Sequence, residues 1–444
     1  MVVVRPLERD SKGAGVRADT FDDTGFQAGS TQEYDGTALV NAAQELDHPI
    51  IFVSVNYRVN GFGFLAGKEV QEGGVSNLGL RDQRLAMQWI QENIEHFGGD
   101  PARVTLFGES AGAQSAFTHT IIENGNNTHN GRPLFRAAIM NSGTTLPADE
   151  IDAPQAQDVY NQLVSATNCT SSNDTLQCLR NVTFQTYWDA VNTLPIFFSY
   201  SSIALPWLPR PDRTDGFYPV YPEDALRSGN YTRVPIITGD QEDEGTLFAQ
   251  NQYNVTNTDL LENYTQLIFP GVSSSHIREL VSAYPDDQAA GSPFGTGDSN
   301  RLWPQYKRLA ALLGDTMFTL RRRSYLYYAS TTQSTWSYLD SHRFLESPLG
   351  TYHTSDIEAI FNYTPIVPTM RSIIPGHTYK SYYISFVYYL DPNVISTQAP
   401  LTYWPQYTTS HPVLLNIRDT GNTLVLDEFR DNSTLAQDLS ILRF

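Results

Sequence analysis

Residues 104–112 read Val-Thr-Leu-Phe-Gly-Glu-Ser-Ala-Gly, an apolar run followed by a serine with a glycine two positions away on each side. This order predicts a buried strand, a sharp turn that carries Ser110, and a helix. Small neighbours are needed because larger side chains would clash on so tight a turn. The pattern indicates an exposed nucleophile at a sheet edge. Gly-x-Ser-x-Gly also arises by chance with a probability of about 0.15 in a chain of this length, so an ordinary tight turn is the alternative.

A serine nucleophile on such a turn needs an acid and then a histidine further along the chain. Glu244 follows a strand-like run at 234–239, and His353 lies in a glycine-led loop after a second strand-like run at 336–339. Open α/β sheets build their sites at the carboxyl ends of the strands. We therefore expect Ser110, Glu244 and His353 to meet at one edge of a sheet.

Four further motifs accompany these three, at Val55–Leu65, Asn77–Gln83, Phe97–Pro101 and Met140–Gly143. With them, the chain resembles the type-B carboxylesterase/lipase family, in particular its secreted fungal members, which are related to the cholinesterases. The resemblance implies an α/β-hydrolase fold, in which helices flank a mostly parallel sheet, over residues 25–444. It also implies hydrolysis of carboxylic esters, either small molecules or lipids, with no cofactor and no metal ion.

In this family the serine attacks the ester, the histidine accepts its proton and the acid orients the histidine. The resemblance assigns these roles to Ser110, His353 and Glu244. Without its motif, Glu244 would be one of 48 acidic residues on a solvated surface. Eight other histidines compete with His353, but none combines a late position with a preceding strand and a glycine-led loop. Asp356 is either a carboxylate that supports His353 or the cap of a helix that begins near residue 357.

An ester hydrolase also needs backbone N–H groups aimed at the developing oxyanion. The resemblance assigns this role to Ala111, Gly25 and Thr24. Two glycines of the family pattern are replaced by Asp23 and Thr24. A carboxylate about 5 Å from the oxyanion would raise the barrier by roughly 3 kcal/mol at an effective dielectric constant near 20. We therefore expect impaired activity. A catalytically silent homologue that binds a partner through its surface is the alternative function.

The first 24 residues do not follow the family pattern. Residues 2–6 resemble an early strand, but the apolar strand expected before Gly25 is replaced by the charged sequence at 16–22. Because residues 7–24 are polar and have no apolar period, we expect residues 1–24 to be a disordered or mis-assembled segment, with a genuine insertion loop as the alternative. The fold is then expected to have early strands missing or altered.

Composition narrows the range of partners. No stretch approaches the roughly 18 apolar residues that a membrane span requires. A net charge of -19 disfavours nucleic acid and anionic lipid. The sequence says nothing about oligomeric state.

Cys169 and Cys178 have no metal-ligand spacing around them. Their counterparts in the family form a disulfide, whereas free thiols would be usual inside a cell. Secretion is favoured by nine Asn-x-Ser/Thr sequons, although no signal peptide follows Met1. The sequons lie at Asn126, Asn168, Asn173, Asn181, Asn230, Asn254, Asn263, Asn362 and Asn432.

Overall fold

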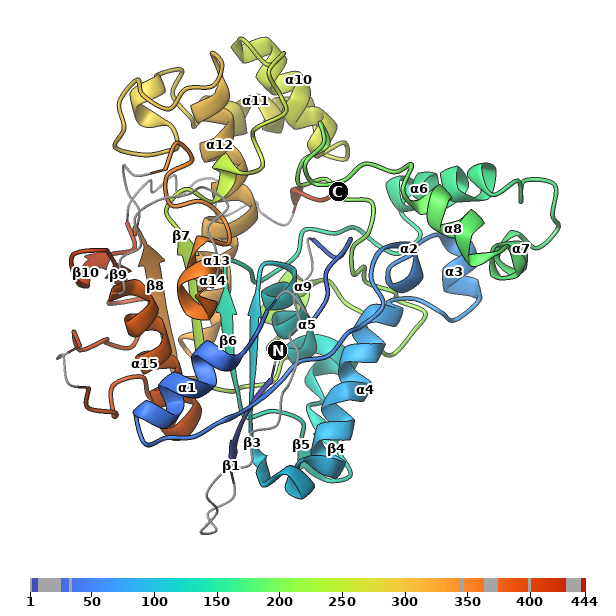
Figure 1. Ribbon diagram of the computed structural model, residues 1–444. Coiled ribbons are helices and arrows are strands. Elements are labelled where there is room, and N and C mark those ends of the chain that lie inside the picture. Colours follow the sequence, from blue (N-terminus) through green and yellow to red (C-terminus); the bar gives the residue numbers. More distant parts are fainter. Residues whose placement is uncertain are drawn as a thin grey trace.

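An eight-stranded sheet forms the centre of the computed structural model (Figure 1). The structure describes residues 2–6, 25–31, 34–342, 347–362, 374–397, 401–428 and 441–444, with only the backbone described for 2–6. The strands lie in the order β10-β9-β8-β7-β6-β3-β1-β2. Their bounds are β1 Val2–Pro6, β2 Ile51–Val53, β3 Gly99–Glu109, β6 Ala137–Asn141, β7 Ile236–Gln241, β8 Thr335–Asp340, β9 Val413–Ile417 and β10 Thr423–Leu426; β4 Thr128–His129 and β5 Arg132–Pro133 form a separate hairpin.

Five neighbouring strands of the sheet are parallel, namely β3, β6, β7, β8 and β9, whereas β10 is antiparallel to β9. Every residue of β6, β7, β8 and β9 is buried. A parallel sheet is covered by helices on both faces, so the polar side chains of β7 and β8 are buried as well as the apolar ones. The predicted mostly parallel α/β sheet is confirmed.

Helices α4, α5, α9 and α13 pack against one another and onto the sheet, while α1, α14 and α15 form a second group. α4 and α5 pack on β3, whereas α15 contacts β1 and β3, and its Phe386 ring packs on Trp336 of β8 (Figure 1). Phe107 of β3 contacts Tyr383 of α15, and Phe117 of α5 contacts Tyr325 of α13. The bounds of these helices are α1 Thr37–Glu45, α4 Leu78–Asn93, α5 Ala111–Gly125, α9 Pro222–Ser228, α13 Leu320–Ala329, α14 Ser355–Phe361 and α15 Ile374–Tyr389.

The remaining helices lie beyond the carboxyl ends of the parallel strands, in two groups that Figure 1 shows at the upper right and at the top. The first group is α2 Asn60–Gly63, α3 Lys68–Glu72, α6 Pro154–Ala166, α7 Thr175–Asn181 and α8 Phe184–Val191. The second is α10 Thr258–Ile268, α11 Ser274–Ser282 and α12 Tyr306–Gly314. Short helical turns are η1 Ile94–Phe97, η2 Glu244–Thr246 and η3 Gln288–Ala290, and η4 Asp315–Thr319 is a π-helical turn. One hydrophobic cluster extends from Phe26 to Phe444.

The early strand β1 lies between β2 and β3 and is antiparallel to both. Val2 pairs with Leu106 and Pro6 with Gly99, so β1 runs away from the edge at which β3 ends. A strand that leads into a turn at this edge would have to run parallel to β3. The early part of the sheet therefore differs from the family arrangement expected from the sequence, in which an apolar strand leads into the turn at Gly25. Residues 7–24, for which disorder was expected, lie outside the described residues.

Cys169 and Cys178 form a disulfide between the end of α6 and α7. The eight sequon asparagines that the structure describes are all exposed, and Asn432 lies outside the described residues. Within the described part of the chain, no helix has both the length and the apolar character needed to cross a membrane. Nor do three or more His, Cys, Asp or Glu side chains among those residues gather as metal ligands would.

We expect the double variant Cys169→Ser/Cys178→Ser to have a lower free energy of unfolding, by about 2.7 kcal/mol, because the bridge restricts a loop of about ten residues in the unfolded chain. Urea-induced unfolding of oxidised protein would measure the difference. In the presence of a reducing agent the two proteins should unfold alike. Equal stability of the two oxidised proteins would contradict a stabilising bridge.

Candidate active site

Ser110 lies on the predicted turn between β3 and α5. Its backbone has φ 52° and ψ -119°, a conformation that is costly for a residue with a side chain. The turn is held because the N–H of Ser110 donates to the carbonyl of Asn141 at 2.9 Å. A Cβ atom on Gly108 would lie 2.1 Å from the carbonyl carbon of Gly112. The glycine at 108 is thus required by the close approach of strand and helix.

His353 is the link between the other two predicted residues. Its Nε2 atom lies 2.7 Å from Oγ of Ser110, and its Nδ1 atom lies 2.5 Å from Oε2 of Glu244. The second carboxylate oxygen of Glu244 accepts the N–H of Gln241 at 2.8 Å. His353 and Glu244 are buried, whereas Ser110 is half-buried. A proton can therefore pass from the serine to an imidazole whose orientation a carboxylate fixes.

Three side chains around His353 were not singled out from the sequence. The rings of Phe248 and Phe318 lie 5.0 and 4.6 Å from the imidazole, and Phe318 projects from the π-helical turn η4. Their apolar surface limits the access of water to His353. The Oε1 atom of the buried Glu109 lies 3.4 Å from Nε2 of His353. Only its position next to Ser110 in the sequence could have indicated that Glu109 lies at the site.

Asp356 supports the serine turn, and its Oδ1 atom also accepts the N–H of Ile357 at 2.9 Å in the first turn of α14. It lies in the first turn of α14, after Thr354 at the N-cap. Its Oδ2 atom accepts the side-chain amide of Asn141 at 2.7 Å, and Asn141 in turn accepts the N–H of Ser110. Burial raises the pKa of Asp356 to about 7, and Asp340 adds to the rise. Asp356 thus makes a contact that fits each of the two interpretations, with Asn141 and with the start of α14.

The predicted oxyanion donors are only partly described. Ala111 is the first residue of α5, where a backbone N–H has no acceptor within its own helix. Gly25 has φ +62°, and a Cβ atom there would lie 2.7 Å from Cδ1 of Leu205. Thr24 and Asp23 lie outside the described residues.

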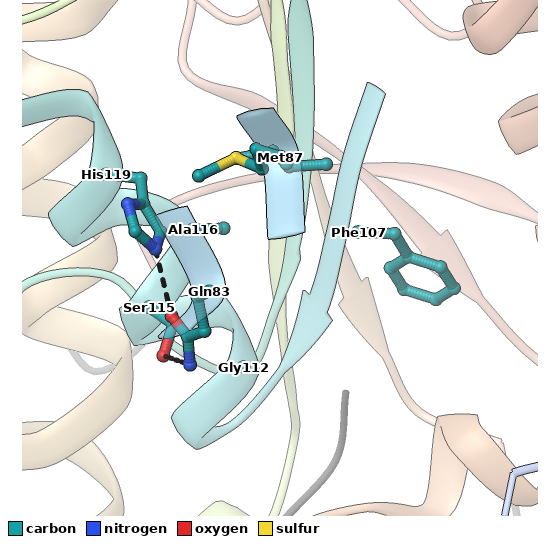
Figure 2. A pocket seen from close by; sticks show the side chains of 8 residues that line it. Gln83, Met87, Phe107, Gly112, Ser115, Ala116 and His119 are labelled. Carbon is teal, nitrogen blue, oxygen red and sulfur yellow. Dashed lines mark hydrogen bonds between the residues drawn. The ribbon is translucent and has the colours of Figure 1, made fainter. Parts of the chain in front are cut away.

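Figure 2 shows a small cavity between α4, β3 and α5, with His119, Gln83 and Met87 among its lining residues. Its volume of about 20 Å³ is enough for roughly one water molecule and far too small for an ester. His119 bonds Gln83 through Nε2 at 2.9 Å, and burial lowers its pKa to about 3. His119 is thus a neutral structural histidine, in agreement with its rejection as the base.

The mostly parallel sheet, with a serine on the turn after β3 and helices on both faces, defines an α/β-hydrolase fold. Residues 21–435 match the model of the carboxylesterase family. The chain belongs to this family and is a carboxylic ester hydrolase.

The chain is similar to several curated fungal lipases. It is 46% identical over 413 residues to Secreted lipase 1 of Botryotinia fuckeliana (strain B05.10), covering 92% of this chain and 70% of the relative. It is 42% identical over 413 residues to Secreted triacylglycerol lipase LIP1 of Gibberella zeae, covering 92% and 68%. It is 40% identical over 439 residues to Lipase 2 of Diutina rugosa, covering 97% and 77%.

Solved structures agree with the fold. The crystal structure of Aspergillus niger EstA has a TM-score of 0.77 and 26% identity, covering 95% of this chain and 78% of that chain. A structure of PNB esterase has a TM-score of 0.72 over 99% of this chain and 84% of that chain. Its identity of 22% supports the fold alone.

Proposed function

We propose that Ser110, His353 and Glu244 are the catalytic triad of this hydrolase. The observation that carries the proposal is the position of His353, whose two ring nitrogens lie 2.7 Å from Ser110 Oγ and 2.5 Å from Glu244 Oε2. A histidine that merely stabilised the core would have no reason to contact a half-buried serine on a strained turn. The aromatic rings beside the imidazole favour the same role, because a drier site strengthens its electrostatic interactions.

The reaction then proceeds in two acyl transfers. Ser110 Oγ attacks the ester carbonyl carbon while Nε2 of His353 takes the hydroxyl proton, which gives a tetrahedral oxyanion. His353 returns this proton to the departing alkoxide as the C–O bond breaks, and the acyl group stays on Ser110. Water then attacks the acyl-enzyme and gives its proton to His353, which passes it to Ser110 Oγ as the acid leaves. Glu244 holds the Nδ1–H and stabilises the imidazolium.

The oxyanion would be bound by the backbone N–H groups of Ala111, Gly25 and Thr24. We expect the sequence at 23–24 to weaken this half of the site, because Thr24 resists backbone conformations open to glycine and the family arrangement would bring the charge of Asp23 near the oxyanion. We propose that the chain is an active esterase with a reduced rate. Its substrates are proposed to be carboxylic esters with lipid-like acyl groups, since several relatives are named lipases.

We also propose that residues 25–444 form one catalytic domain and that the protein is a secreted glycoprotein. The continuous hydrophobic cluster supports the first proposal. The disulfide, the exposed sequon asparagines and the names of two relatives as secreted lipases support the second.

The triad predicts the effect of single substitutions. Ser110→Ala should lower kcat for a short p-nitrophenyl ester by at least about 10³-fold, because the acyl group has no acceptor, and Glu244→Gln by about 10³–10⁴-fold, because the histidine loses its orientation. Ser282→Ala and Glu279→Gln on the exposed face of α11 are matched controls that should retain activity. Turnover by Ser110→Ala at the unsubstituted rate would place the nucleophile elsewhere.

The double variant Asp23→Gly/Thr24→Gly should raise kcat/KM by about one to two orders of magnitude, since a single oxyanion donor is worth about 10²–10³ in rate. Steady-state kinetics with the same ester would measure the gain. Asp23→Asn alone separates the charge from the backbone requirement. An unchanged rate in the double variant would show that residues 23 and 24 do not limit catalysis.

When the chain is directed through the secretory pathway of a fungal host, we expect treatment with an endoglycosidase to lower its mass. The reason is that the eight described sequon asparagines are accessible to glycosyl transfer. Asn173→Gln should remove one glycan. A mass that the treatment leaves unchanged would count against the secreted glycoprotein.

A further inference from the structure

The carboxylate of Asp243, next to Glu244 in the chain, is bound by three donors from two other segments. Its Oδ1 atom accepts the hydroxyl of Ser292 at 2.8 Å and the N–H of Phe294 at 2.9 Å. Its Oδ2 atom accepts the N–H of Thr351 at 3.0 Å. The side chain is buried. All three donors are neutral, so a carboxylate is held here by directed hydrogen bonds.

The contact with Thr351 is part of a longer junction between the two loops that follow β7 and β8. The N–H of Asp243 donates to the carbonyl of Thr351 at 3.0 Å, and Asp243 and Tyr352 form a parallel bridge. Thr246 adds a bond from its hydroxyl to the carbonyl of Leu349 at 2.8 Å. The loop that carries His353 is therefore bonded, through the two residues just before the histidine, to the turn that carries Glu244.

Gly350 shows how close this approach is. Its φ is +67°, and a Cβ atom there would lie 2.0 Å from Oδ2 of Asp243. Only a residue without a side chain leaves room for the carboxylate against the loop backbone. The glycine that leads the histidine loop is thus explained by Asp243 rather than by the substrate.

We propose that Asp243 is a positioning residue, whose carboxylate fixes the loop at Thr351 so that His353 reaches both Ser110 and Glu244. The proposal rests on the catalytic role proposed for His353. Asp243 touches no reacting atom, and it acts through the backbone two residues before the base. A displacement of about 1 Å at a catalytic group can cost about 10²-fold in rate, so a weaker junction should lower kcat with little effect on substrate binding.

The charge on Asp243 gives this junction a pH dependence. Burial raises the pKa of Asp243 to about 7, and Glu242 adds to the rise, whereas the bonds from Phe294, Ser292 and Thr351 lower it. Lys307 and Tyr306 of α12 are the other titratable groups that interact with it, and Asp298 lies near Lys307. Above pH 7 the carboxylate accepts charge-assisted bonds, which are about twice as strong as bonds to the neutral acid. The junction therefore weakens as the pH falls.

The test compares Asp243→Asn with Asp298→Asn, a control on an exposed side chain in the loop before α12. Asparagine at 243 has one carbonyl oxygen in place of the two carboxylate oxygens that accept bonds from Ser292, Phe294 and Thr351. Its NH₂ group would then face a backbone N–H that has lost its acceptor. We expect kcat for a p-nitrophenyl ester at about pH 8 to fall by about 10–100-fold, with KM changed by less than about threefold. The melting temperature should fall by a few degrees, because a buried N–H loses its acceptor. Asp298→Asn should behave as the unsubstituted protein. A kcat for Asp243→Asn within twofold of the unsubstituted value would overturn the proposal.

The pH profile of kcat distinguishes positioning from simple structural support. Because protonation of Asp243 weakens its bonds to the histidine loop, kcat of the unsubstituted protein should fall more steeply on acidification through about pH 7 than kcat of Asp243→Asn. Equal steepness in the two proteins would contradict the role of the charge.

A second variant keeps the proposal testable if Asp243→Asn does not fold. Ser292→Ala removes one donor and leaves the carboxylate in place. We expect kcat to fall by about three- to tenfold, because only part of the free energy of one hydrogen bond to a charged group is lost in the position of His353. An unchanged kcat would contradict the proposal. Activity in Ser110→Ala would instead overturn the proposed function, whereas an inactive Ser110→Ala together with a fully active Asp243→Asn would overturn the positioning role alone.

Discussion

The register of the parallel strands is the constraint on which the rest of the structure depends. Glu109 pairs with Asn141, Asn141 with Gly239, and Gly239 with Tyr338, so β3, β6, β7 and β8 end close to one line. The loops after β3, β7 and β8 can therefore deliver a serine, a glutamate and a histidine to one point. A shift of one strand by a single residue would move its whole set of side chains to the other face.

Several acids are buried in the fold, and the groups that contact each one determine whether it is charged. Arg322 bonds Asp427 and Asp240. Burial alone would raise the pKa of Asp427, but Arg322 lowers it to about 2. Burial raises the pKa of Asp240 to about 6 in spite of Arg322. Asp243 and Asp356 have only neutral donors, and their pKa values are raised to about 7. The charge of these two supporting carboxylates therefore varies near neutral pH, because burial outweighs the neutral donors of both and the charge of Lys307 near Asp243.

The sequence predicted features that depend on neighbouring residues, but it did not predict contacts between residues far apart in the chain. The turn at Ser110 follows from the order of apolar, small and glycine residues, and the histidine and acid follow from their positions after strands. The contact between Asp243 and Thr351 joins residues 108 positions apart, and no spacing rule predicts it. The direction of β1 was equally inaccessible, because three valines in succession have the same pattern read either way. Nor did the sequence show that Asp356 contacts Asn141.

The site consists of two parts that depend on different stretches of the chain. The proposed proton relay is built from residues between 104 and 356, and the contacts that hold it, at Asn141, Asp243 and Gln241, lie within that range. The oxyanion donors proposed at Gly25 and Thr24 depend on the chain before β2, where β1 runs antiparallel to β3. Proton transfer and oxyanion stabilisation contribute separately to the rate. Changes before Gly25 can therefore alter the rate of ester hydrolysis while the relay itself keeps its geometry.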